Sequence, residues 1–179
     1  MENISVREML VEDINFIVDY FHDSSEEFIR GMGASKSKFL SKEEWYVKIH
    51  AEVIKNYKEK QLYYTIWELN NKPIGHCNIN KLVFNKSAYM HLQMWDSTKR
   101  KKGLGVQLVK KSLPFFFNNF KLENLFCEPY ALNPAPNKTL PKAGFDFVKT
   151  YKTSPGRINF YQQVNKYVLT QEKFNQLYK

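Results

Sequence analysis

Four consecutive cations come directly before two glycines that are spaced one residue apart, Gly103 and Gly105. The strand-like run SAYMHLQMW precedes this turn, and a helix-like run begins at Leu104. A helix N-terminus already carries about half a positive charge, so added cations are destabilising unless a ligand balances them. Exposed amides, glycines and nearby cations favour an anion such as a phosphate, with a solvated basic loop as the alternative. The four cations are Lys99, Arg100, Lys101 and Lys102.

Two well-known phosphate loops do not fit this turn. A P-loop needs Lys-Ser or Lys-Thr after its last glycine, and neither Gly103 nor Gly105 is followed by such a pair. A dinucleotide-binding turn needs a third small residue, but Leu108 occupies that position. The turn therefore predicts a phosphate site of another kind.

The charge of the chain is unevenly distributed. The net charge is +9, with −3 over residues 1–60 and +12 over residues 61–179. A basic field implies an anionic partner, which could be a nucleotide-like cofactor, nucleic acid or a membrane surface. No apolar run approaches membrane-spanning length, and the N-terminus lacks the pattern of a signal peptide. We expect no membrane association and a cytoplasmic location.

The cysteines and histidines give little sign of a metal centre. Cys77 and Cys127 lie in strand-like runs without a CxxC motif, so we interpret them as buried small hydrophobic residues. The four histidines lie in different predicted elements without metal-ligand spacing, and His91 is expected in a core or at the surface. We therefore predict no metal.

The periodicity of the sequence predicts a mixed α/β (α+β) domain over residues 1–179. Two early helices follow a first strand, and Ser41 with Glu44 forms a capping box that starts a third helix. A hairpin turns at residues 70–73, and the apolar residues after Gly103 follow helical spacing. The predicted strands are 3–9, 61–69, 74–84, 87–96, 123–130, 146–153 and 158–170, with helices over 11–23, 24–33, 42–57, 104–120 and 134–143.

This order of elements resembles the Gcn5-related N-acetyltransferases (GNAT) along nearly the whole chain. The acetyl-CoA loop of that family is [QR]xxGx[GA], and Arg100, Gly103 and Gly105 match it. Asn133, followed twelve residues later by Phe145, resembles a second element of the ribosomal-protein (RimJ/RimL) branch. The serine of that element is Pro136 here. The resemblance implies a central mixed, mostly antiparallel, splayed sheet of six to seven strands flanked by about four helices.

The resemblance also implies how acetyl-CoA binds as the acetyl donor. Its pyrophosphate would lie on backbone amides from Lys102 to Gly105. The pantetheine arm would pair with a strand edge in the gap between the fourth and fifth strands. Asn133 would hold the arm from the other side, although its position before Pro134 also suits a helix N-cap. The implied cofactor-binding residues are Gln93, Met94, Trp95, Arg100, Lys101, Lys102, Gly103, Leu104, Gly105, Asn133 and Asn137.

Acetyl transfer to an amine requires a base for the amine and an acid for the leaving thiolate. Relatives that act on protein N-termini carry a glutamate five residues before the asparagine, which implies Glu128 as the base. The alternative is that Glu128 only pairs with a basic residue. The common tyrosine acid is Leu140 here, so Tyr130 or Thr139 is a candidate acid, beside solvent.

The acceptor is an amine that the sequence does not identify. The acidic excess of residues 1–60 suits a cationic amine such as a protein N-terminus, a polyamine or an aminosugar. We expect the pocket for this amine to be formed by Trp45, Tyr46, Tyr151, Phe160 and Tyr161. We expect the protein to be a monomer or a homodimer. The rival hypotheses are a basic nucleic-acid-binding module, which is disfavoured because the cations flank a helix start, and a catalytically degenerate CoA sensor.

Overall fold

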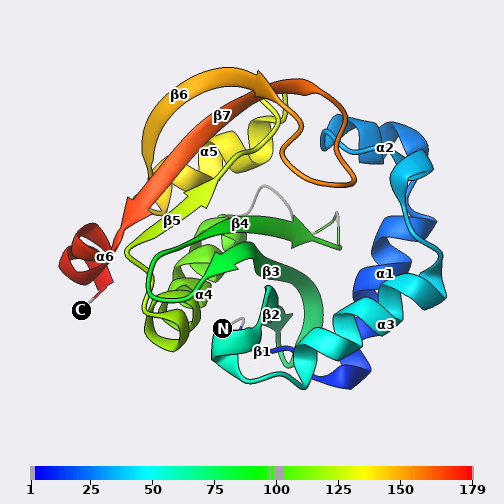
Figure 1. Cartoon of the computed structure of the whole chain (residues 1–179), viewed down its shortest axis with the longest axis horizontal. Helices are drawn as coiled ribbons and strands as arrows, with labels where there is room; N and C mark the ends of the chain where they lie inside the picture. The colour runs from blue at the N-terminus through cyan, green and yellow to red at the C-terminus, as the bar shows by residue number, and fades with distance from the viewer. Residues whose placement is uncertain (1–2, 97, 99–102, 179) are drawn as a thin grey trace.

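The computed structural model describes residues 3–96, 98 and 103–178 and contains one seven-stranded sheet (Figure 1). The strand order is β1-β2-β3-β4-β5-β7-β6; β4 and β5 run parallel, and all other neighbours are antiparallel. The GNAT-type mixed sheet is thus confirmed, with six α-helices in place of about four. The strands are β1 (Ile4–Glu8), β2 (Leu62–Leu69), β3 (Lys72–Val83), β4 (Ser87–Met94), β5 (Asn124–Cys127), β6 (Asp146–Thr153) and β7 (Gln162–Thr170); the helices are α1 (Ile14–Asp23), α2 (Glu26–Gly31), α3 (Lys42–Val53), α4 (Leu104–Phe120), α5 (Pro134–Lys142) and α6 (Gln171–Tyr178).

The hairpin between β2 and β3 turns on two asparagines. Asn70 and Asn71 have φ angles of 51° and 61°, and Leu69 pairs with Lys72 on either side of them. A two-residue turn of this type requires positive φ at both central positions, and asparagine tolerates that conformation better than most residues. The pair therefore replaces the more usual Asn-Gly and confirms the predicted hairpin.

The main core lies between α4 and one face of the sheet. The helical spacing predicted after Gly103 is confirmed, because every apolar side chain on that face of α4 is buried. Phe117 stacks on Phe174 of α6 with ring centroids 4.4 Å apart, which closes the core at its far end. The buried apolar residues of α4 are Leu104, Leu108, Val109, Leu113, Phe116, Phe117 and Phe120.

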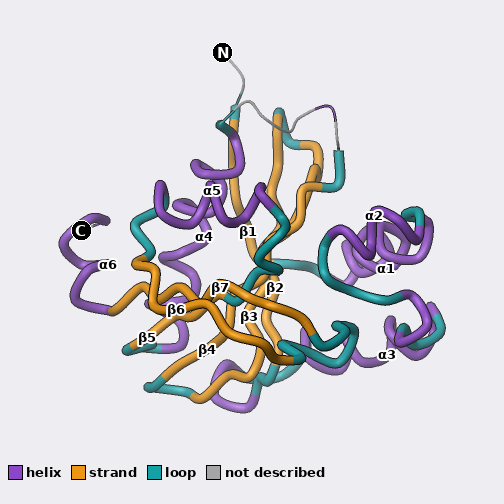
Figure 2. The backbone as a smooth tube through the Cα atoms, turned by 90° about the horizontal axis from the view of Figure 1, so that it is seen from above, coloured by secondary structure: helices purple, strands orange, loops and turns teal. Residues whose placement is uncertain are grey.

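A second core lies on the opposite face, where α1, α2 and α3 cover β2 and β3. Ile14, Ile17, Val18 and Phe21 form the buried stripe of α1. Figure 2 shows these three helices on one side of the sheet and α4 and α5 on the other. None of the helices in the described part of the chain is long and apolar enough to cross a membrane.

The helix that starts at the predicted capping box is shorter than expected. Both hydrogen bonds of the box, between Ser41 and Glu44, are present. The helix ends at Val53, because the Lys60 ammonium donates to the carbonyls of Glu52 (2.5 Å) and Val53 (2.8 Å).

The sheet splits between its two parallel strands. β4 and β5 pair only from Ser87–Asn124 to Tyr89–Phe126. The Cys127 thiol still donates to the Met90 carbonyl at 3.1 Å, and β4 then continues to Met94 while the chain after β5 turns away (Figure 1). The split leaves one edge of β4 without a neighbouring strand exactly where the candidate site begins.

Candidate active site

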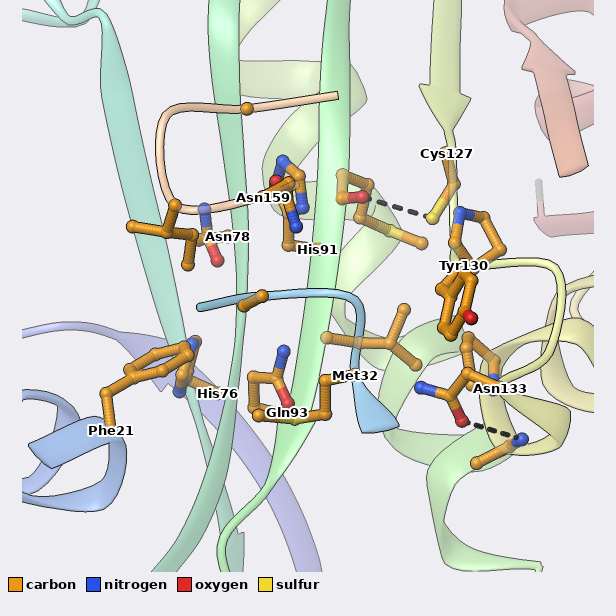
Figure 3. A pocket seen from close by; sticks show the side chains of 18 of the residues that line it. Phe21, Met32, His76, Asn78, His91, Gln93, Cys127, Tyr130, Asn133 and Asn159 are labelled. Carbon is orange, nitrogen blue, oxygen red and sulfur yellow. Dashed lines mark hydrogen bonds between the residues drawn. The ribbon is translucent and has the colours of Figure 1, made fainter. Parts of the chain in front are cut away.

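A cavity of about 1120 Å³ extends from the split between β4 and β5 to the three early helices. α1 to α3 and the β6–β7 loop line one end, and the first turn of α4 and α5 line the other. Figure 3 shows His91 and Gln93 from β4 on one side of this cavity, with Tyr130 and Asn133 on the other. The cavity thus joins two ends with different linings, and the split in the sheet lies between them.

The glycine turn lies at the α4 end of the cavity. Gly103 is the N-cap of α4 with φ of 75°, and no side chain of the described residues caps the helix there. Gly103 and Gly105 both line the cavity. A left-handed glycine and an uncapped first turn leave helix amides directed at the cavity, which is the arrangement that binds anions. Arg100, Lys101 and Lys102 lie outside the described residues.

No packing contact among the described residues requires a glycine at position 105. A Cβ added there would meet nothing nearer than Thr139 Oγ1, at 4.0 Å. Glycine within a helix costs about 1 kcal/mol relative to alanine. Space is therefore kept open at this position beside the cavity. Leu104 differs from both glycines, because its side chain is buried in the main core and only its backbone can serve a ligand.

The edge of β4 presents different residues from those predicted. Trp95 N–H donates to the Ile74 carbonyl at 2.8 Å, so Trp95 faces β3. Because backbone groups alternate in direction along a strand, Gln93 also faces β3, whereas Leu92 and Met94 face the split. The carbonyl of Met90, two residues before Leu92, also faces the split, because it accepts a hydrogen bond from Cys127 on β5.

The predictions for Trp95 and for the backbone of Gln93 are therefore corrected. Trp95 does not line the cavity, and its indole donates to Nδ1 of His76 at 2.8 Å. Gln93 does line it, through a side chain that accepts a hydrogen bond from the Tyr20 hydroxyl at 3.2 Å. Leu92, which the sequence analysis missed, joins Met94 at the strand edge.

Asn133 and Asn137 have different roles in α5. Asn133 lines the cavity and is the N-cap of the helix, with its Oδ1 accepting from Ala135 N–H at 3.3 Å. Asn137 does not line the cavity. Its amide nitrogen donates to the carbonyls of Tyr130 and Asn133, and its oxygen accepts from Asn165 and Tyr167. Asn137 therefore ties α5 to β7. The cofactor contact predicted for Asn137 is corrected accordingly.

Glu128 lies at the split, on the cavity side of the sheet. Met90 and Cys127 are both buried in the main core, so the next residues on each strand, His91 and Glu128, point to the opposite face. Both line the cavity. The side chain of Glu128 is only 5% exposed. This places a carboxylate and an imidazole on the two sides of the point where the strands separate.

Two neighbours hold the Glu128 carboxylate. The Tyr151 hydroxyl donates to Oε1 at 2.5 Å, and Nζ of Lys166 lies 3.6 Å from the same oxygen. Burial, together with the negative charge of Glu128, raises the pKa of Tyr151, so its hydroxyl remains a donor. Glu128 therefore has the ion pair of the alternative hypothesis as well as the access to the cavity that a base requires.

The candidate acids lie on the other side of the split. Tyr130 lines the cavity, and its ring meets Phe160 edge to face at 5.8 Å. Thr139 also lines the cavity, but its hydroxyl donates to the Ala135 carbonyl at 2.9 Å. Leu140 is fully buried in the main core. Tyr130 is thus the candidate whose hydroxyl has no hydrogen-bond partner among the described residues.

Comparison with known proteins assigns the fold to a family. Residues 4–146 match the family model of the acetyltransferase (GNAT) domain. The chain belongs to the GNAT acetyltransferase family. The comparison with curated proteins finds no significant match.

Solved GNAT structures of low sequence identity share the fold. A spermidine N-acetyltransferase from Vibrio cholerae, solved with CoA and spermine, has a TM-score of 0.77 and 16% identity, covering 96% of this chain and 98% of that one. The aminoglycoside acetyltransferase AAC(6')-Ib, solved with CoA and kanamycin, has a TM-score of 0.74 and 16% identity, covering 99% and 100%. RimL, a ribosomal L7/L12 α-N-protein acetyltransferase solved with CoA, has a TM-score of 0.74 and 14% identity, covering 93% of each chain.

The floor of this GNAT cavity contains polar residues that sequence reasoning missed. Asn78 and Asn80 of β3 and His91 of β4 line it. Burial, with the charge of Lys81 adding to it, lowers the pKa of His91 to about 4, so the imidazole is neutral at physiological pH. The alternation of asparagine with Cys77 and Ile79 was the available signal, but it equally suits a strand with one solvated face.

The aromatic walls of the GNAT cavity also differ from the prediction. Trp45 lines the cavity, whereas the other four predicted aromatic residues do not. Tyr46 stacks on His50 instead, and Tyr161 is 69% exposed. The aromatic residues that do line it are Tyr20, Phe21, Phe28, Trp45, Tyr64, Trp67 and Tyr130.

The two cysteines of the GNAT domain are free and buried, as predicted. Burial raises the pKa of both Cys77 and Cys127. Within the described residues, no group of three or more histidine, cysteine or acidic side chains could hold a metal ion.

Proposed function

We propose that this GNAT protein is an N-acetyltransferase that moves an acetyl group from acetyl-CoA directly to a primary amine. One observation carries the proposal: the split between β4 and β5 opens into a cavity that has an uncapped helix N-terminus at one end and Glu128 beside the split. A thioester carrier and an amine can therefore meet at the split from opposite ends. The free, buried cysteines agree with a cytoplasmic location.

The cofactor end suits the diphosphate and the arm of CoA. The amides of Gly103 to Gly105, at the positive end of α4, would bind the diphosphate. The neighbouring cations Arg100, Lys101 and Lys102 add positive charge by sequence. The backbone of Leu92 and Met94 would pair with the amides of the pantetheine arm as a neighbouring strand does. Asn133 lies across the split from them.

Glu128 is the proposed base. The amine nitrogen forms a bond to the thioester carbonyl carbon, the carbon–sulfur bond breaks, and the nitrogen loses one proton. Glu128 takes that proton directly or through one water molecule. Tyr151 and Lys166 fix the orientation of the carboxylate. The leaving thiolate takes a proton from Tyr130 or from solvent, because the position of the family's tyrosine is filled by buried Leu140.

Two measurements on the wild-type protein test this proposal. Isothermal titration should show saturable acetyl-CoA binding. Release of CoA thiol, followed over a panel of amines, should require both the protein and an amine. Binding without amine-dependent thiol release would favour the sensor hypothesis. Salt-sensitive oligonucleotide binding without any acetyl-CoA binding would favour the nucleic-acid hypothesis.

A further inference from the structure

The mouth of the cavity at the end formed by α1 to α3 is positively charged. Lys38, Lys48 and Arg157 line it from three separate segments, opposed by Glu27 alone. Lys38 donates to the Asn159 carbonyl at 2.6 Å. Lys48 and Arg157 are exposed and have no hydrogen bond or ion pair with any residue in the described ranges. Two cationic groups at this mouth are therefore available to a ligand.

Of the acidic residues among the first sixty, Glu27 is the one that lines the cavity in the described part of the chain. Six of the twelve carboxylates in this segment are held by partners within the same sixty residues, so the charge balance of the segment does not describe the cavity. Lys42, for example, lies between Asp19 (2.7 Å) and Asp23 (3.0 Å). The other held carboxylates are those of Glu8 with Tyr57, Asp13 with Arg7, Glu44 at the Ser41 cap and Glu52 with Lys55.

The residues that line the interior of the cavity carry uncharged polar groups without hydrogen-bond partners. Within the described residues, four buried side-chain atoms have no hydrogen-bond partner, and three of them belong to residues that line the cavity. They are Oδ1 of Asn80, Nε2 of His91 and Oε1 of Gln162. A buried polar atom without a partner is destabilising, so such groups indicate a ligand that brings N–H or O–H groups.

A cationic acceptor meets only two carboxylates among the described lining of this cavity. Glu128 and Glu27 are the acidic residues among the described lining, and Glu128 is already paired with Lys166. Neutral acceptors bind the N–H groups of an uncharged amine, which is the nucleophilic form, and stabilise the ammonium form less than a free carboxylate would. A second ammonium on the acceptor would meet Lys48 and Arg157 at the mouth, whereas an anionic group would be attracted there.

We propose that the acceptor is a monoamine that carries an anionic group, a carboxylate or a phosphate. Asn80 and His91 receive its amine, and Lys48 and Arg157 bind its anionic group at the mouth. This inference rests on the proposed function and adds the acceptor class to it. It replaces the polyamine and aminosugar acceptors that the charge of the sequence suggests.

Matched amines test the inference through kcat/KM for thiol release from acetyl-CoA. O-phosphoethanolamine should exceed ethanolamine by about tenfold, equal to about 1.4 kcal/mol, and tyrosine should exceed tyramine in the same direction. Spermidine should be the poorest substrate. The two pairs distinguish phosphate from carboxylate, and both preferences should shrink as salt screens the charges.

Charge reversal supplies the second arm. Arg157→Glu and Lys48→Glu should each remove most of the preference for the anionic amine and leave acetyl-CoA affinity unchanged. Lys110→Glu, an exposed cation on α4, is the matched control and should leave the preference intact. Equal or better use of spermidine, or turnover of the matched amines without an anionic group in the absence of turnover of either anionic amine, would overturn the acceptor class alone. Acetyl-CoA binding without thiol release on any amine of the panel would favour the sensor hypothesis instead. Absence of acetyl-CoA binding would overturn the proposed function as well.

Discussion

The two ends of the cavity recognise their ligands by different means. At the cofactor end, the candidate groups are backbone amides of one short segment, Gly103 to Gly105, and the edge of β4. At the acceptor end, side chains from α1 to α3, β3, β4 and the β6–β7 loop come together. Recognition by backbone groups can be predicted from a short sequence motif, because it requires glycines at fixed positions. Side-chain recognition assembled from distant segments has no such motif.

The largest expected effect concerns the carboxylate between the two ends. Glu128→Gln should lower kcat by about a hundredfold or more, since general-base catalysis contributes about 10² to 10⁴. Acetyl-CoA affinity should not change. The amide oxygen can still accept from Tyr151, so the fold should be retained. Steady-state kinetics at saturating acetyl-CoA measures the effect.

Glu123→Gln is the matched control, since Glu123 is exposed and precedes the same strand. It should keep wild-type kcat. An unchanged kcat in Glu128→Gln would reduce Glu128 to the ion-pair role.

The cores beneath the two ends should respond differently to acid. His76 packs against Phe21 and Tyr64 of the second core, and burial lowers the pKa of this histidine to about 3. No histidine ring among the described residues contacts an aromatic ring of the main core. Below pH 6.5 the unfolded state binds the proton and the folded state does not, so the free energy of unfolding falls as pH decreases towards 3. The loss should be about 2 kcal/mol between pH 6.5 and 5.

His76→Asn isolates this effect, because the asparagine oxygen can still accept from Trp95. Urea unfolding at pH 7 and pH 5 should show a smaller pH dependence in His76→Asn than in wild type. His50→Asn on α3 should keep the wild-type dependence. The same pH dependence in both variants would contradict a neutral, buried His76.

The smallest expected effect contrasts two helical glycines at opposite ends. Gly105→Ala should raise the free energy of unfolding of the free protein by up to about 1 kcal/mol, because the methyl group meets no protein atom closer than 4.0 Å. It should also weaken acetyl-CoA binding by about fivefold, equal to about 1 kcal/mol. Calorimetry gives both quantities.

Gly31→Ala, at the end of α2, also has open space around its added methyl group. It should leave acetyl-CoA affinity unchanged. Equal affinities in both variants would mean that no ligand approaches Gly105.

Features that depend on neighbours in the sequence were predicted correctly, whereas features that depend on distant partners were not. The apolar stripe of α4, the Asn70–Asn71 hairpin and the capping box at Ser41 depend on neighbours in sequence, and each was predicted. Trp95 was misplaced because strand parity depends on the pairing with β3. Asn137 was misplaced because its partners lie on β7, about thirty residues away.

The charge of the acceptor end could not be predicted for a related reason. Net charge over a segment does not tell which carboxylates pair locally, as Asp19 and Asp23 do with Lys42. Lys48 of α3 and Arg157 of the β6–β7 loop line the same cavity only in the folded chain. Only the folded structure shows that these two cations line one cavity.

Acetyl-CoA affinity of Gly103→Asp against Gly103→Asn tests the central claim most directly. Both side chains have the same size and tolerate the positive φ of this N-cap, and a Cβ added there meets no atom of the described residues within 4 Å beyond its chain neighbours. They therefore differ in one negative charge at the helix N-terminus. If that terminus receives the diphosphate, the aspartate variant should bind acetyl-CoA at least about tenfold more weakly than the asparagine variant at low salt. Equal dissociation constants for the two variants would contradict the account.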